Sequence, residues 1–128
     1  MTSKNKAEII VREFLGAMEA RDLEKAKSFL RSDFSMVFPG NAVFTELSDL
    51  VSWSKERYQS IAKTYERFDT CTDEEGAIVY CFGTLRGVWL NGDEFSGIRF
   101  IDRFGVHDGV IFDQRVWNDL EIYRRGGT

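Results

Sequence analysis

The sequence has few of the residues that build metal and redox centres. Its 128 residues include two cysteines, Cys71 and Cys81, one histidine, and no Cys-x-x-Cys pair. The usual tetrahedral zinc patterns need several such ligands at close spacing, so these patterns are excluded and no metal or other cofactor is expected. Two thiols could form one disulfide, but isolated cysteines are typical of a reduced cytoplasmic protein, which is the location we expect.

Long apolar runs and long basic runs are also missing. No apolar stretch approaches the roughly 18 residues of a membrane-spanning helix, and the N-terminal segment MTSKNKAEII lacks the apolar centre of a signal peptide. The net charge is −4, and no basic run extends beyond Arg124-Arg125. We therefore expect neither a membrane nor a nucleic acid as a partner.

Aromatic residues, by contrast, are abundant. They make up 14% of the chain and include 11 phenylalanines. The length suits one domain, residues 1–128, with a single core. The surplus of aromatic side chains indicates either an aromatic-lined cavity or interface, or simply a core rich in phenylalanine, and the sequence leaves these alternatives open.

The hydrophobic pattern predicts helices first and strands afterwards. Apolar residues recur at helical spacing over residues 5–20, from 22 to about 31, and from 45 or 48 to 61. A short strand over 34–38 ends at Pro39, the single proline. Alternating patterns then predict strands over 64–73, 77–90, 93–106 and 110–119, with a tight turn at Asn91-Gly92. This order indicates an α+β domain.

Three helices cannot cover four strands of about 12 residues completely. We therefore expect a cone-shaped barrel, in which a curved antiparallel sheet wraps around the three N-terminal helices, and a homodimer in which a second subunit covers the outer sheet face. The residues assigned to that outer face mix aromatic and cationic side chains, as interfaces do: Tyr80, Phe82, Arg99, Ile101 and Arg103.

The segment from Phe95 to Trp117 is predicted to be the central hairpin, with Asp108-Gly109 as its two-residue loop. In that register Asp102 faces Arg115 and Phe100 faces Trp117. A carboxylate and a guanidinium would then lie among aromatic side chains, which describes either a prepared site or an ordinary cross-strand ion pair. Of these two, the sequence favours the ordinary ion pair. A bulge in either strand would abolish the pairing of Asp102 with Arg115. Asp113 is expected to face solvent.

Two segments resemble the nuclear transport factor 2-like superfamily, and in particular its SnoaL-like and ketosteroid-isomerase-like members. The first is REFLGAMEARDLEKAKSFLRSDFSMVFPG (12–40), which is similar to the opening helix–turn–helix–strand pattern. The second is FIDRF…DGVIFDQRVWND (100–119), which is similar to the closing hairpin. The resemblance spans nearly the whole chain and implies the cone-shaped fold. It implies little about activity, because this fold carries isomerases, cyclases, dehydratases, hydrolases and non-catalytic modules.

The resemblance also allows the catalytic positions to be compared one by one. Ketosteroid isomerases use a tyrosine where this chain has Phe14, and a general base where it has Phe38, so both functions are missing. Asp102 matches their second oxyanion donor. SnoaL-like cyclases use a histidine in the sheet, whereas His107 falls in the predicted turn. Steroid isomerisation is therefore not expected, since proton abstraction needs a base within reach.

Three functional hypotheses remain. The first is an enzyme that acts on a small apolar or aromatic compound by acid/base chemistry, such as an isomerase, cyclase or hydrolase. The second is a non-catalytic protein that binds such a ligand in the same cavity, and the third is a dimeric interaction module with a filled cavity. Asp102 and Arg115 are the candidate catalytic residues. The candidate cavity walls are Phe14, Phe38, Trp53, Tyr58, Phe100 and Trp117.

Overall fold

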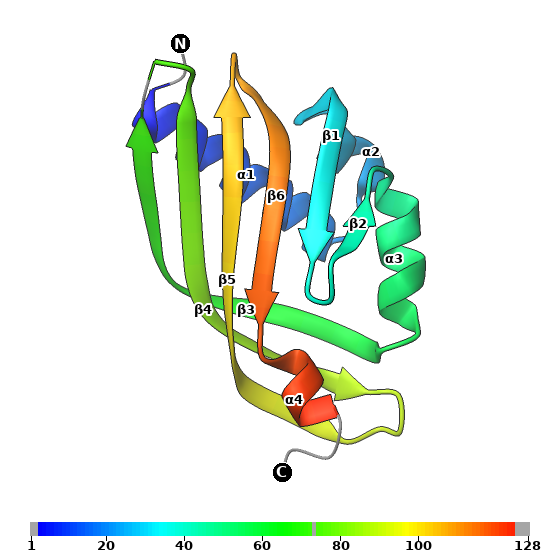
Figure 1. Ribbon diagram of the computed structural model, residues 1–128. Helices are drawn as coiled ribbons and strands as arrows, with labels where there is room; N and C mark the ends of the chain where they lie inside the picture. The colour runs from blue at the N-terminus through cyan, green and yellow to red at the C-terminus, as the bar shows by residue number, and fades with distance from the viewer. Residues whose placement is uncertain (1–2, 73, 125–128) are drawn as a thin grey trace.

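A computed structural model describes residues 3–72 and 74–124 and shows helices packed against one curved sheet (Figure 1). Six strands form this sheet in the order β2-β1-β6-β5-β4-β3. The strands are β1 (Leu30–Phe38), β2 (Ala42–Phe44), β3 (Tyr58–Thr72), β4 (Ala77–Trp89), β5 (Glu94–His107) and β6 (Val110–Asn118), and the helices are α1 (Lys4–Glu19), α2 (Leu23–Lys27), α3 (Leu47–Lys55) and α4 (Leu120–Arg124).

The predicted α+β class is confirmed, and so is the curved sheet around the N-terminal helices. The sheet is not closed, because β2 and β3 lie at opposite ends of the strand order. Neighbouring strands are antiparallel except for β1 and β6, which run parallel. Among the described residues, no helix is both long and apolar enough to cross a membrane.

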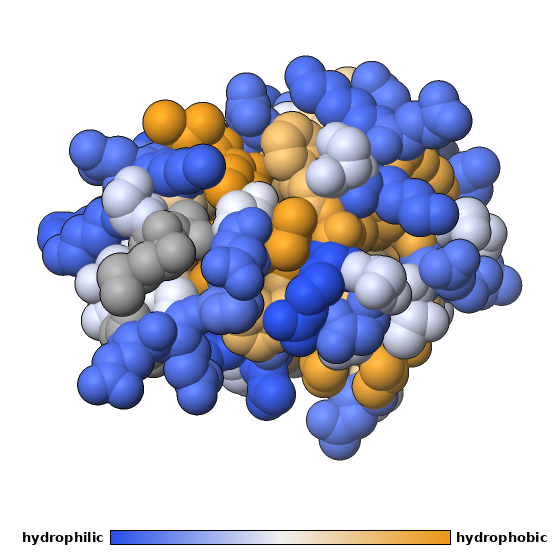
Figure 2. Space-filling view, turned by 90° about the horizontal axis from the view of Figure 1, so that it is seen from above, coloured by the Kyte–Doolittle hydropathy of each residue, from blue (hydrophilic) through white to orange (hydrophobic). Residues whose placement is uncertain are grey.

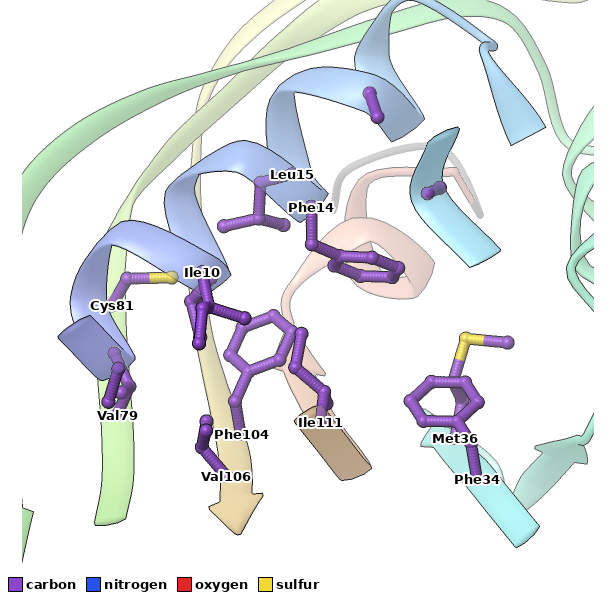
Figure 3. Close-up of a cluster of buried hydrophobic side chains, with 14 of the residues drawn as sticks. Ile10, Phe14, Leu15, Phe34, Met36, Val79, Cys81, Phe104, Val106 and Ile111 are labelled. Carbon is purple, nitrogen blue, oxygen red and sulfur yellow. The ribbon is translucent and has the colours of Figure 1, made fainter. Parts of the chain in front are cut away.

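Helix α1 fills the upper half of the concave sheet face. The Ser3 side chain caps it by accepting a hydrogen bond from the Lys6 amide, at 3.2 Å. Its apolar residues recur every three or four positions, so one face is buried against β4, β5 and β6 (Figure 3). Phe14 lies at the centre, with its ring 6.0 Å from that of Phe104 and 6.3 Å from that of Phe34.

Sharp bending of β3 along β4 depends on two glycines. A Cβ atom at Gly83 would overlap the carbonyl oxygen of Thr64, and one at Gly87 would overlap that of Ser60. The β3–β4 register shifts nearby, between Tyr58 and Ser60 and again between Tyr65 and Arg67. The sheet therefore curls around the helices where β4 has no side chain in the way.

Several predicted boundaries are wrong. The third helix ends at Lys55, not at Ile61, because Tyr58 and the residues after it pair with β4. The strand predicted over 34–38 begins at Leu30, which the sequence pattern assigned to the second helix. Strand β2 and helix α4 were not predicted. In the predicted connection at 73–76, Asp73 lies outside the described residues.

Candidate functional site

A cavity of about 360 Å³ lies against the lower half of the sheet, which is the part that the core side chains of α1 leave uncovered. The C-terminal halves of α1 and α3, the β1–β2 turn, α4 and the concave sheet face surround it. Most of its wall is apolar. Five of the six predicted wall residues line it: Phe14, Phe38, Trp53, Tyr58 and Phe100.

The end of the molecule opposite the cavity has a different character. Figure 2 views that end, which carries the β5–β6 turn, and shows many hydrophilic side chains around its edge with hydrophobic ones exposed between them. His107 lies in this turn region with its Nδ1 3.4 Å from an Asp108 oxygen. The histidine is absent from the cavity wall, in agreement with its predicted place in the turn.

The charged centre of the cavity wall is a pair formed by Lys63 and Asp102. Alternation along β5 turns Asp102 to the concave face between Phe100 and Phe104, and its side chain is completely buried. Lys63 reaches it from β3, with its Nζ 2.6 Å from the Asp102 Oδ2. The Lys63 side chain is 24% exposed, and its Nζ lies 5.0 Å from the centre of the Phe100 ring.

The two oxygens of the Asp102 carboxylate have different surroundings. Oδ2 accepts from Lys63, whereas Oδ1 is buried without a hydrogen-bond partner among the described residues. Burial alone would lower the pKa of the Lys63 ammonium, but the adjacent Asp102 carboxylate outweighs this effect and raises that pKa. Lys63 is therefore a cation at neutral pH, and Oδ1 is a buried acceptor without a hydrogen-bond partner among the described residues.

Neighbouring titratable groups remain protonated near neutral pH. Burial raises the pKa of the Cys81 thiol to about 12, and the negative charge of Asp102 adds to this effect. Burial likewise raises the pKa of Tyr65 to about 12 and raises that of Tyr58. Asp102 is the fully buried carboxylate of the cavity wall, whereas Glu19 is exposed and Glu121 is half-buried.

The predicted pairing of Asp102 with Arg115 is wrong, because β6 has a bulge. His107 pairs with Val110 as predicted, but Phe112 is an extra residue, and beyond it Asp102 pairs with Val116. Arg115 consequently faces outward, 56% exposed, with its Nε 3.5 Å from Asp113.

Gly105 explains the position of this bulge. A Cβ atom there would overlap the Phe112 ring, and the Gly105 amide donates to Asp113 Oδ1 at 3.0 Å. Asp113 is therefore mostly buried and paired, contrary to its predicted solvent exposure. The same register turns Trp117 outward, 52% exposed, so it is not a wall residue.

Three arginines line the cavity, and one of them stacks on an aromatic cluster. The Trp53 ring lies 5.7 Å from the Phe38 ring and 5.3 Å from that of Phe44. Arg57 stacks on Trp53 at 4.0 Å and lies 3.6 Å from Glu121 of α4. The other two arginines are Arg21 and Arg124.

The sequence analysis did not predict two residues of the cavity wall, Lys63 and Gln114. Lys63 is 39 positions away from Asp102, and no local pattern connects them. Gln114 is 4% exposed and lines the cavity. The bulge hid it, because the unbulged register assigns Gln114 to the outer face. Among the described residues, no cluster of three histidine, cysteine or acidic side chains could hold a metal ion.

Comparison with solved structures identifies the fold. No protein-family model and no curated protein matches the sequence. An NTF2-like protein of unknown function from Burkholderia pseudomallei is 17% identical, with a TM-score of 0.77 over 94% of this chain and 95% of that one. TerC, co-crystallised with polyporic acid, is 14% identical, with a TM-score of 0.77 over 94% and 96%.

A candidate polyketide cyclase from Xanthomonas campestris is 16% identical, with a TM-score of 0.75 over 98% of both chains. At these identities, the likeness shows the fold alone.

Proposed function

We propose that this chain, which has the nuclear transport factor 2-like fold, binds a small apolar or aromatic compound in its cavity and acts on it by acid/base chemistry at Asp102. One observation carries the proposal: in the wall of an apolar cavity of about 360 Å³, a fully buried carboxylate is held by Lys63 through one oxygen, and its other oxygen has no hydrogen-bond partner among the described residues. Proteins seldom leave such a group unpaired, except where it serves a ligand or a reaction.

The arrangement suits removal of a proton from a bound substrate. Asp102 Oδ1 accepts the proton, and the carboxylate loses its charge. The electron pair left on the substrate moves to a neighbouring carbonyl oxygen, and the Lys63 ammonium, which keeps its own proton, offsets the new negative charge. An apolar wall strengthens this electrostatic stabilisation, because little water screens it.

Ligand binding is the first step to test. A panel of aromatic and polyketide-like compounds, with polyporic acid included because TerC was crystallised with it, is screened by thermal stabilisation. A ligand at 100 times its dissociation constant adds about 2.7 kcal/mol to the free energy of unfolding. For a chain of 128 residues, that corresponds to an increase of about 10 °C in melting temperature.

Proton transfer is then tested without knowledge of the product. Each ligand is incubated with protein in D₂O, and deuterium incorporation is measured by mass spectrometry. We expect wild type and Asp69→Asn, a control at an exposed carboxylate outside the cavity wall, to catalyse exchange, and Asp102→Asn to lose it. Equal exchange in Asp102→Asn would refute the assigned role.

A second candidate is a binding protein without turnover. Phe14 and Phe38 favour it, because they lack the polar groups of the ketosteroid isomerases at those positions. This candidate predicts thermal stabilisation without deuterium exchange for any ligand of the panel.

We also propose that two copies associate through the outer sheet face. In Figure 1 α1 covers the opposite face of the sheet. Ile101 and Trp117 are cross-strand partners on the outer face and are 37% and 52% exposed. Exposed aromatic and aliphatic side chains beside Arg103 and Arg115 are typical of interface composition.

A further inference from the structure

Gln114 is a second buried polar group of the cavity wall without a partner. Its residue exposure is 4%, and the structure shows no hydrogen bond between its amide and another described residue. Buried amides are normally paired, because losing their hydrogen bonds to water is unfavourable. Two polar groups of the cavity wall, the Gln114 amide and Asp102 Oδ1, therefore have no hydrogen bond to another described residue, and of these Oδ1 is itself a fully buried atom.

The strand register brings these two groups close together. Asp102 pairs with Val116 and Phe104 pairs with Gln114, so Asp102 and Gln114 are diagonal neighbours on the concave face. Diagonal neighbours have Cβ atoms within roughly 7–8 Å, and their side chains can contact one small molecule. The bulge at Phe112 produces this arrangement, since it turns Gln114 inward.

The two groups require different hydrogen-bonding groups on a ligand. Asp102 is ion-paired through Oδ2, so its carboxylate is an acceptor, and Oδ1 requires a donor such as a hydroxyl group. The Gln114 amide offers an NH₂ donor to a carbonyl oxygen. An ether or ester oxygen placed at Oδ1 would leave two acceptors facing each other.

We propose that Gln114 determines specificity, and that the ligand carries a hydroxyl group and a carbonyl group on neighbouring carbon atoms, with the hydroxyl donating to Asp102 Oδ1 and the carbonyl accepting from Gln114. This inference rests on the proposed function, whose ligand it specifies. The apolar remainder of the ligand packs against the aromatic wall near Trp53.

Four probes with the same diphenylethane skeleton test it. Benzoin has both groups, deoxybenzoin lacks the hydroxyl, benzoin methyl ether has no donor, and 1,2-diphenylethanol lacks the carbonyl. Trp53 and Trp89 line the cavity, so tryptophan fluorescence reports binding directly. We expect benzoin to bind at least about tenfold more tightly than each of the other three, the factor of one missing hydrogen bond.

Two variants assign the two contacts separately. In Gln114→Met, the affinity for benzoin falls about tenfold, to that for 1,2-diphenylethanol. Benzoin should still bind more tightly than benzoin methyl ether. In Asp102→Asn, the advantage over the methyl ether disappears, because the asparagine amide can donate to the ether. Gln59→Met, the same change on an exposed residue outside the cavity wall, leaves all four affinities unchanged.

The outcomes separate the inference from the proposed function. Equal affinities for the four probes, or benzoin binding unaffected by Gln114→Met, would overturn the inference while ligand binding stands. If the four probes do not bind but compounds of the aromatic panel do, the hydroxyl–carbonyl rule is wrong. If the panel gives no binding either, the proposed function fails and the inference fails with it.

Discussion

Replacing Lys63 with methionine tests whether the Lys63–Asp102 ion pair is buried enough to be shielded from solvent. The change keeps the apolar stem, and it leaves both oxygens of the completely buried Asp102 carboxylate without a hydrogen-bond partner in the part of the chain that the structure describes. Removing one member of a buried pair costs about 3–5 kcal/mol. Because Lys63 is 24% exposed, we expect the lower end, about 3 kcal/mol. With an unfolding entropy of about 0.27 kcal/mol/K for this length, the melting temperature falls by about 11 °C.

The assay is urea unfolding at pH 7, followed by circular dichroism. Arg67→Met is the matched control, because Arg67 lies on the same strand and pairs with Asp69 at the surface, where the two side chains are 67% and 49% exposed. That control should lose no more than about 0.5 kcal/mol. The double variant Lys63→Met/Asp102→Leu should recover most of the loss, since an apolar pair replaces the lone charge. A loss below about 1 kcal/mol in Lys63→Met would show that solvent screens the pair, and would refute the buried-pair argument.

Four further predictions concern other parts of the molecule. A thiol reagent should label Cys71 alone in the folded protein, because Cys81 is buried and its pKa is raised to about 12; two labelled thiols before unfolding would contradict this. The raised pKa also predicts an effect of pH on stability. The stabilising contribution of Cys81 is complete below about pH 9 and is lost as the pH rises through about 12. The alkaline fall in unfolding free energy should therefore be smaller in Cys81→Ala. Gly83→Ala should lose about 2–3 kcal/mol in urea unfolding through overlap with the β3 backbone, whereas Gly16→Ala, with open space around the new methyl group, should gain about 0.5–1 kcal/mol. Trp117→Glu should halve the mass measured by light scattering of the proposed dimer, and an unchanged mass would remove this face from the interface.

Local patterns were sufficient to predict most of the fold. The Asp108-Gly109 loop has positive φ at both residues, as the sequence predicted, and His107 pairs with Val110. The Ser3 side chain caps α1 three positions before the amide that it accepts from. These features depend on neighbours within a few positions. The helix α3 boundary failed for the opposite reason, because pairing of Tyr58 with Trp89 on β4 outweighed the local helical pattern.

The site was harder to predict, because its pairings are not local. A single extra residue, Phe112, exchanged the two faces of β6 beyond it, which removed Arg115 and Trp117 from the cavity and placed Gln114 there. Gly105 is the visible signal for this bulge, but a glycine within a strand marks a tight bend or a close backbone approach as readily as a bulge. Asp102 was found from its place among aromatic residues, whereas its partner Lys63 could be identified only from the folded sheet.

The position of α4 affects how the protein should be handled. Its residues Leu120, Glu121 and Arg124 line the cavity, and in Figure 1 the C-terminal end of the chain lies far from the N-terminal end. An affinity tag fused a few residues after Arg124 would begin close to α4 and therefore close to the cavity wall. Such a tag can reach the cavity and compete with small ligands there. A tag ahead of Ser3 starts from the other end of the molecule, so binding measurements should rely on that placement or on protein from which the tag has been cleaved.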